Sequence, residues 1–145
     1  MLYLDTSALV KLYVDEEEGV ELVHQAVREA EGIATSTIAY AEARASLARK
    51  QREGTFSSDE LRGVVSDLDD DWPNYTRLDT ANFVSLRAGK LAELHELRGF
   101  DSIHLASALR LSEMFEDLRF LAFDSRLTTA ARNASLNLYE KPNSI

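Results

Sequence analysis

The sequence of 145 residues has no cysteine, only two prolines and only six glycines. Without cysteine the chain can form no disulfide, zinc–thiolate site or iron–sulfur cluster, and it has no thiol nucleophile. We therefore expect a reducing compartment, the cytoplasm. Because proline and glycine are scarce, no stretch resembles a linker, and the sequence predicts a single domain over residues 1–145.

Long apolar runs are missing as well. No window reaches the roughly 18 apolar residues that a transmembrane helix needs. The first residues, Met1 to Asp5, have neither the basic cluster nor the long apolar segment of a secretory signal. The sequence therefore predicts a protein with no membrane partner.

Basic residues are outnumbered by acidic ones. The 16 Lys and Arg residues against 25 Asp and Glu residues give a net charge of -9. Taken as a whole, this charge disfavours a nucleic-acid partner, because phosphate binding needs a basic surface. Eight of the acids, however, fall in two runs at 15–18 and 67–71 that contain no base. We expect both runs to be solvated patches.

Short apolar segments alternate with helical patterns along the chain. The apolar segments are too short for helices and lack polar alternation, which is typical of buried parallel strands. Their order predicts an α/β fold with three α/β/α layers around a central parallel sheet of four to five short strands. The expected strands are 2–4, 33–36, 75–78, 120–123 and 136–139, and the main expected helices are 16–30, 37–52, 57–72, 80–97 and 101–115.

Four acidic residues stand at special positions in this pattern. Asp5 and Asp124 each follow an apolar strand directly, Asp101 begins a helix after a glycine, and Glu42 lies in a helix among small and apolar neighbours. The carboxyl ends of parallel strands share one edge of a sheet, and ligands bind there in open α/β folds. We therefore expect these acids to approach one another.

Each acid also has an ordinary structural explanation. An aspartate after a strand commonly caps a helix, and a glutamate in a helix can simply face solvent. The set is more informative than its members, because carboxylates that share a small site repel one another unless a cation neutralises them. Oxygen ligands without cysteine favour Mg²⁺, with Mn²⁺ as the alternative. Such an ion can activate water and stabilise a phosphoryl transition state.

Four segments carry these acids in a fixed order: Leu4–Leu12, Ser36–Glu42, Asp101–Ala108 and Ala122–Leu127. Together they resemble the PIN-domain ribonucleases, and in particular the VapC toxins of type II toxin–antitoxin pairs. The resemblance spans nearly the whole chain. It implies a PIN-like fold, a single PIN domain over 1–145, and a Mg²⁺-dependent endoribonuclease that hydrolyses RNA phosphodiester bonds.

The resemblance also implies roles and partners. Asp5 and Asp101 would be the direct metal ligands, and Glu42 and Asp124 would hold metal-bound waters or a second ion, so that all four are catalytic. Ser7 would hydrogen-bond within the acid cluster and is also a candidate for substrate binding. The implied partners are an RNA substrate, a cognate VapB-type antitoxin and a second copy of the chain in a homodimer.

Basic residues near the acids are candidates for substrate binding. Arg44 opens a stretch that also contains Arg49, Lys50 and Arg52 and has no acid from residue 43 to 52. This stretch is either a solvated helix face or a contact for RNA phosphates. Arg126 lies close enough in sequence to Asp124 to touch the scissile phosphate, with a local ion pair as the alternative.

His104 lies one turn after Asp101 on the same helix face. A histidine there can act as a catalytic base, but the position favours a residue that packs the helix or supports the acids.

Other functions remain open at this point. The chain can be a PIN-domain RNA-processing nuclease without an antitoxin, or a non-catalytic PIN module that only binds. A phosphohydrolase of the haloacid-dehalogenase type is disfavoured, because it needs a second aspartate at position 7, which is serine. Net charge does not decide the matter: without the four site acids and the two acidic runs, 13 acids remain against 16 bases.

Overall fold

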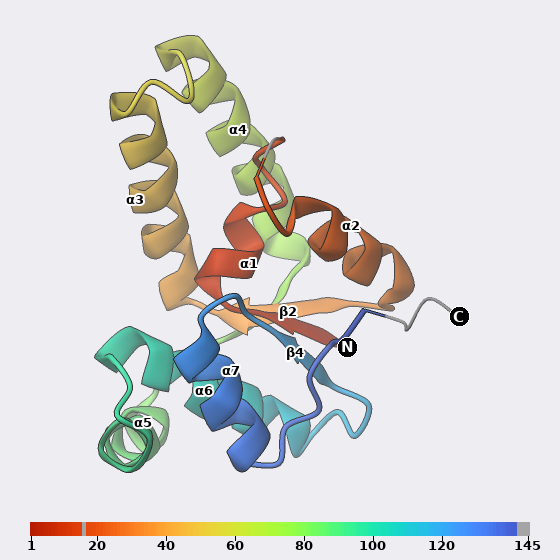
Figure 1. The fold of residues 1–145 in the computed structure, drawn as a ribbon, viewed down its shortest axis with the longest axis vertical. Helices are drawn as coiled ribbons and strands as arrows, with labels where there is room; N and C mark the ends of the chain where they lie inside the picture. The colour runs from red at the N-terminus through yellow and green to blue at the C-terminus, as the bar shows by residue number, and fades with distance from the viewer. Residues whose placement is uncertain (16, 142–145) are drawn as a thin grey trace.

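The computed structural model describes residues 1–15 and 17–141, and within these ranges four strands alternate with seven α-helices (Figure 1). Glu16 of the first acidic run lies outside them. In chain order the elements are β1 (Leu2–Leu4), α1 (Thr6–Val10), α2 (Val20–Glu29), β2 (Ile33–Ser36), α3 (Ile38–Arg52), α4 (Ser58–Asp71), the 3₁₀ turn η1 (Trp72–Asn74), β3 (Thr76–Leu78), α5 (Asn82–His95), α6 (Gly99–Ser112), β4 (Arg119–Leu121) and α7 (Ser125–Asn133).

All pairings in the sheet are parallel, and the strand order is β3-β2-β1-β4. The chain runs from β1 through β2 to β3 on one side and returns to place β4 on the other side of β1. The order therefore reverses between β1 and β4, and this is where parallel α/β sheets bind ligands. Residues Asp5 and Asp124 follow the two strands that flank this switch point.

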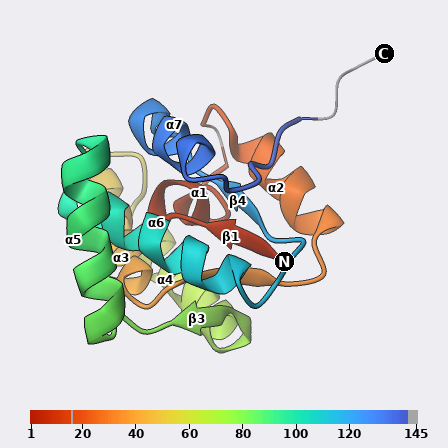
Figure 2. The same ribbon diagram turned by 90° about the horizontal axis from the view of Figure 1, so that it is seen from below.

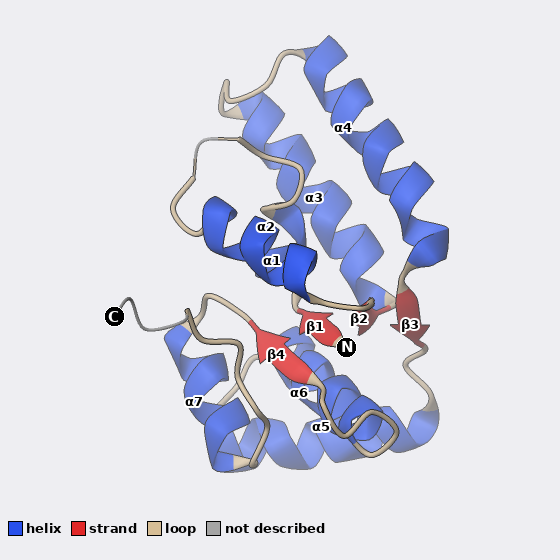
Figure 3. Ribbon diagram, turned by 90° about the vertical axis from the view of Figure 1, so that its right-hand side faces the viewer, coloured by secondary structure: helices blue, strands red, loops and turns tan. Residues whose placement is uncertain are grey.

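Helices cover both faces of the sheet, with α1 to α4 on one side and α5 to α7 on the other (Figure 3). Side chains of a strand point alternately to its two faces. In β1, Leu2 and Leu4 accordingly pack with α1, α2 and α3, whereas Tyr3 packs with residues of α6 and α7. Seen from below, α6 runs across the sheet with α5 alongside it (Figure 2). The α/β prediction with three layers is confirmed.

The predicted strand at 136–139 is not formed as a full strand. Only Leu138 makes a parallel bridge, to Phe120 of β4. The backbone bonds that join this segment to β4 run from the Phe120 N–H to the Asn137 carbonyl and from the Tyr139 N–H to the Phe120 carbonyl. Tyr139 is buried against the α2 side and donates a hydrogen bond to Glu29, so a side chain rather than a longer ladder anchors this segment. Among the described residues the sheet thus has four strands.

The described acids of the two runs are mostly exposed, as expected of solvated patches, and three of them also make contacts. Glu17 of the first run forms ion pairs with both Lys11 and Lys50. In the second run Asp71 accepts a hydrogen bond from Tyr13 at 2.8 Å, and Asp69 accepts one from Tyr40. These carboxylates link elements that are distant in sequence. Within the described ranges, no helix is both long and apolar enough to cross a membrane.

Candidate functional site

A pocket of about 580 Å³ lies where the strands end and contains all four of the acids singled out in the sequence. It is bounded by the start of α1, by one face of α3, by the start of α6 and by the cap of α7. The lining residues are Asp5, Thr6, Ser7, Glu42, Ala45, Ser46, Arg49, Arg52, Arg98, Asp101, His104 and Asp124.

Asp5 is the most buried of the acids, with 4% of its surface exposed. It follows β1 and caps α1: its Oδ1 accepts hydrogen bonds from the Ala8 N–H at 2.9 Å and the Ser7 hydroxyl at 2.7 Å. Both bonds use Oδ1, so Oδ2 can take another partner. Burial raises the pKa of Asp5, and the nearby Asp101 carboxylate adds to this effect. Ser7 occupies the supporting position that the sequence resemblance implies.

Asp124 and Asp101 face the same pocket from the other layer. Asp124 caps α7 and accepts a hydrogen bond from the Leu127 N–H at 2.9 Å. Asp101 lies in the first turn of α6, which begins two residues earlier than the sequence predicted. Burial, followed by repulsion from Asp124, raises the pKa of Asp101. Asp5 and Asp124 therefore do cap helices, as the ordinary structural explanation predicts. They also line the pocket.

Glu42 is held in a chain of hydrogen bonds. Its Oε1 accepts from the Thr6 hydroxyl at 2.6 Å and lies 3.0 Å from His104 Nε2. On the other side of the imidazole, Nδ1 lies 2.8 Å from the hydroxyl of Tyr3. Burial acts to raise the pKa of Glu42, but the hydrogen bonds from His104 and Thr6 outweigh it, and the pKa lies below its usual value.

A count of protons fixes the tautomer of the neutral His104 ring. The one hydroxyl proton of Thr6 goes to Glu42, yet His104 Nε2 also lies 2.9 Å from the Thr6 oxygen. Since Glu42 and Thr6 can only accept from the ring, Nε2 carries the proton. Nδ1 is then the acceptor for the Tyr3 hydroxyl. Both His104 and Tyr3 are buried.

The donor set of the pocket fits a hard divalent cation. Its candidate ligands are carboxylate and hydroxyl oxygens. Burial, to which repulsion from neighbouring carboxylates adds, raises the pKa of Asp5 and Asp101 and so disfavours the charged forms that a cation would stabilise. Within residues 1–15 and 17–141, no group of three or more acidic or histidine side chains is placed to hold a metal ion by itself. Mg²⁺ typically keeps several waters and uses one or two carboxylates, so an open, wet pocket suits it.

The two arginines predicted to bind substrate lie outside this pocket. Arg44 points its guanidinium at Tyr40, with a 3.2 Å hydrogen bond to the hydroxyl and a cation–π contact. Arg126 donates to the Glu96 carbonyl at 3.2 Å. Three other arginines line the pocket instead. Two of them, Arg49 and Arg52, belong to the same basic stretch as Arg44, and the third, Arg98, carried no signal in the sequence.

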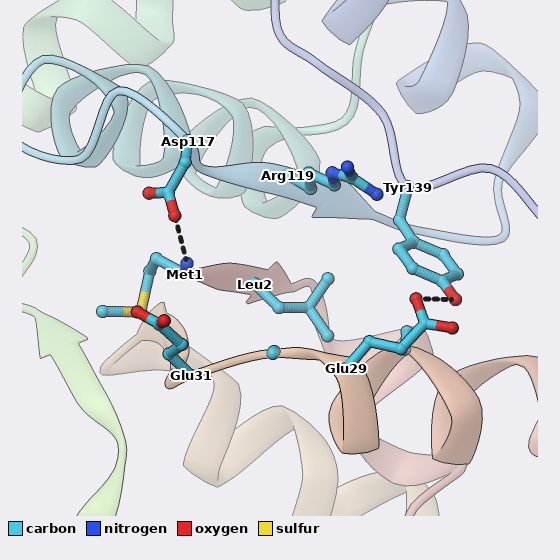
Figure 4. Close-up of a pocket in the computed structure, with 9 residues that line it drawn as sticks. Met1, Leu2, Glu29, Glu31, Asp117, Arg119 and Tyr139 are labelled. Carbon is cyan, nitrogen blue, oxygen red and sulfur yellow. Dashed lines mark hydrogen bonds and ion pairs between the residues drawn. The ribbon is translucent and has the colours of Figure 1, made fainter.

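A second hollow lies at the opposite edge of the sheet, where the strands begin (Figure 4). Some of its charged groups already have partners: the Met1 amine lies 3.6 Å from Asp117, and Tyr139 donates to Glu29 at 3.0 Å. Parallel α/β sheets bind ligands at the carboxyl ends of their strands, not at this edge. The acidic pocket is therefore the candidate functional site.

Comparison with known proteins agrees with this geometry. Residues 2–135 match the PIN domain family. Ribonuclease VapC45 and Ribonuclease VapC49, both of Mycobacterium tuberculosis, are each 35% identical over 134 residues, which cover 92% of this chain and 91% of theirs. The crystal structure of FitAcB from Neisseria gonorrhoeae has the same fold, with a TM-score of 0.71, 18% identity and 97% of each chain covered.

A second solved structure, VapBC2 from Rickettsia felis bound to a DNA fragment from their promoter, has a TM-score of 0.63 at 16% identity and covers 96% of this chain and 98% of that one. At such identities the two structures establish the fold alone, whereas the family match and the curated relatives establish the family. The chain belongs to the PIN-domain family and, within it, to the VapC-type ribonuclease toxins of VapBC toxin–antitoxin systems.

Proposed function

We propose that this chain is a Mg²⁺-dependent endoribonuclease that hydrolyses RNA phosphodiester bonds at the acidic pocket, with Mn²⁺ as an alternative ion. The observation that carries the proposal is the convergence of Asp5, Glu42, Asp101 and Asp124 on one pocket at the switch point of the sheet. The family and the ribonuclease relatives support the reaction type, and the carboxylate-rich lining of the pocket supports the ion.

The residues of the pocket have different roles in this reaction. A divalent cation bound there supplies Lewis-acid charge that activates water and stabilises the phosphoryl transition state. Asp5, oriented by Ser7 and the Ala8 N–H, and Asp101 would be its protein ligands. The hydrogen bonds from His104 and Thr6 outweigh burial and hold the pKa of Glu42 below its usual value, which favours the ionised form. Its Oε1 is engaged by Thr6 and His104, so Oε2 orients the attacking water and accepts its proton. Asp124 holds further water beside Asp101.

In the cell, this single PIN domain would act in the cytoplasm and be silenced by a cognate VapB-type antitoxin. The Rickettsia felis structure, in which VapBC2 is bound to promoter DNA, supports a partnered toxin. We further propose a homodimer, which is consistent with four well-exposed apolar side chains, Phe83, Leu86, Leu94 and Phe100.

An assay of RNA cleavage tests this function. The purified chain should cleave single-stranded RNA internally in Mg²⁺ or Mn²⁺, stop in EDTA and resume when the ion is restored. Expression of the chain alone should arrest growth. Cleavage that continues undiminished in EDTA, or none in either ion, would contradict the proposal.

The hydrogen-bond chain behind Glu42 gives a second prediction. His104→Leu removes the donor to Glu42 and leaves the buried Tyr3 hydroxyl without its acceptor. We therefore expect the rate of cleavage to fall about 10- to 100-fold. We expect the free energy of unfolding to fall by about 1–3 kcal/mol. His104→Gln keeps an amide donor and should restore much of kcat. Tyr3→Phe keeps the ring stacked on Phe120, so its effect isolates the hydroxyl.

These variants distinguish positioning from packing. If His104→Gln lowers kcat as much as His104→Leu while its thermal midpoint recovers, the hydrogen bond to Glu42 has no part in positioning it.

A further inference from the structure

Three arginines line the acidic pocket without an ion-pair partner. Arg49 and Arg52 come from α3, and Arg98 immediately precedes α6. All three side chains are exposed. None of the ion pairs among residues 1–15 and 17–141 includes any of them. Their charge is therefore available to a ligand of the pocket.

The face of α3 that carries Glu42 leads directly to two of these arginines. Residues 42, 45, 46, 49 and 52 all line the pocket and recur at the three- and four-residue spacing of one helix face. Ala45 and Ser46 are small and leave the floor between acid and arginines open. At 1.5 Å per residue, Arg49 lies roughly 10 Å and Arg52 roughly 15 Å along the helix from Glu42. These distances are too long for contacts with the scissile phosphate. They fit contacts with the neighbouring phosphates of the RNA strand.

Arg98 stands on the other wall of the pocket. It precedes Asp101 by three residues at the start of α6, in the opposite helical layer from α3. Its guanidinium is near enough to Asp101 to oppose the effects of burial and of Asp124 on the pKa of that residue. The acids thus lie between a pair of arginines on one side and a single arginine on the other.

Neighbouring cations do not have this freedom. Lys11 and Lys50 both pair with Glu17, and Arg44 is engaged by Tyr40. On α3, therefore, Arg49 and Arg52 line the pocket, whereas Arg44 and Lys50 are engaged by Tyr40 and Glu17 and do not line it.

We propose that Arg49 and Arg52 bind phosphates on one side of the scissile phosphate and that Arg98 binds a phosphate on the other side. This inference rests on the proposed ribonuclease function and extends it by defining the path of the RNA strand across the pocket. It also explains how a chain with a net charge of -9 binds a polyanion: three cations surround the reaction centre, and no lining residue of the pocket belongs to either acidic run.

Binding measurements with a cleavage-deficient chain test the inference. In an Asp5→Asn background, the Kd for a fluorescent single-stranded RNA is measured by anisotropy over a series of salt concentrations, with Arg49→Ala, Arg52→Ala or Arg98→Ala added. Each substitution should weaken binding about five- to tenfold and reduce the slope of log Kd against log salt by about 0.7, the value for one phosphate contact on a single strand.

The matched control is Arg87→Ala, which makes the same charge change on α5. Arg87 pairs with Glu113, just beyond the far end of α6 and roughly 18 Å along that helix from Asp101. It should leave both Kd and slope unchanged. With Asp5 intact, the three pocket variants should raise KM and leave kcat within about threefold, because contacts to flanking phosphates bind ground state and transition state alike.

Three results would overturn the inference. One is an unchanged Kd and slope in all three pocket variants while the wild-type chain cleaves RNA, which leaves the ribonuclease function standing. Another is a loss of RNA affinity in Arg44→Ala and not in the pocket variants, which would put the RNA on the outer face of α3. The third is a loss of binding to poly-L-glutamate but not to RNA, which would assign the arginines to an acidic protein partner.

Discussion

Replacing Asp5 with asparagine is expected to abolish RNA cleavage and to leave the fold as stable as the wild type or more stable. Asparagine keeps the side-chain oxygen that caps α1 and accepts from Ser7 and the Ala8 N–H. It removes the negative charge that would bind the cation. We expect the cleavage rate to fall about 1,000-fold or more, which corresponds to about 4 kcal/mol of transition-state stabilisation.

The stability part of this prediction follows from the sign of the pKa shift. Burial raises the pKa of Asp5 in the folded state. The stability contributed by such a group is present at low pH and is lost as the pH rises through the folded pKa. At neutral pH without metal, the Asp5 carboxylate therefore destabilises the fold, and the neutral asparagine does not. Thermal melts in EDTA should show the variant at or above the wild type at pH 7, with the difference closing as the pH falls.

Asp79→Asn is the matched control. Asp79 follows β3 directly, as Asp5 follows β1, and it is exposed and lies outside the acidic pocket. The Asp79→Asn variant should cleave RNA at the wild-type rate. The account fails here if Asp5→Asn retains wild-type cleavage, or if its loss of cleavage is matched by a loss of folded protein.

Adding Mn²⁺ or Mg²⁺ to the metal-free chain is expected to raise its thermal midpoint by about 5–10 °C. An ion that binds only the folded state stabilises it by about 2.7 kcal/mol at 100 times its Kd. A domain of this size gains roughly 2–4 °C per kcal/mol. The gain should be large here because the ion also relieves the repulsion that raises the pKa of Asp101 beside Asp124.

The same measurement on the Asp5→Asn, Asp101→Asn double variant locates the ion. We expect its midpoint to shift by less than about 1 °C, while Asp79→Asn shifts as the wild type does. An equal shift in the double variant would mean that the ion binds elsewhere on this acidic chain, and the assignment of Asp5 and Asp101 as ligands would be wrong.

The acids of the pocket could be predicted from the sequence because each is tied to a strong local pattern. Asp5 ends a strand that is fully buried, and Asp124 is separated from β4 by only two residues. Once the sheet is parallel, the topology alone brings such residues to one edge. The place of Glu42 could be predicted once the segment after β2 was assigned as a helix.

The arginines were predicted less well, for two different reasons. Helix periodicity places Arg49, seven residues after Glu42, on the face of the glutamate, whereas Arg44, two residues after it, faces away. That signal was present in the sequence and favours Arg49. Arg98 could not be found in this way, because its place in the pocket depends on how α6 crosses to the sheet.

The supporting role of Tyr3 could not be predicted from the sequence either. In the sequence it is one of three apolar strand residues, and its ring does pack in the core. Its hydroxyl reaches His104 across 101 positions of the chain, a contact that only the packing of α6 against β1 creates. Similarly, the segment at 136–139 has the composition of a strand, but one bridge is all that forms beside β4.

The chemistry of the RNA ends tests the central claim most directly. If carboxylates and a divalent cation direct an external water at phosphorus, cleavage requires Mg²⁺ or Mn²⁺, and the RNA 2′-hydroxyl takes no part in bond breaking. The account predicts linear phosphate and hydroxyl ends, and continued cleavage when the 2′-hydroxyl at the cut site is replaced by hydrogen. Products with a 2′,3′-cyclic phosphate, formed equally well in EDTA, would contradict it.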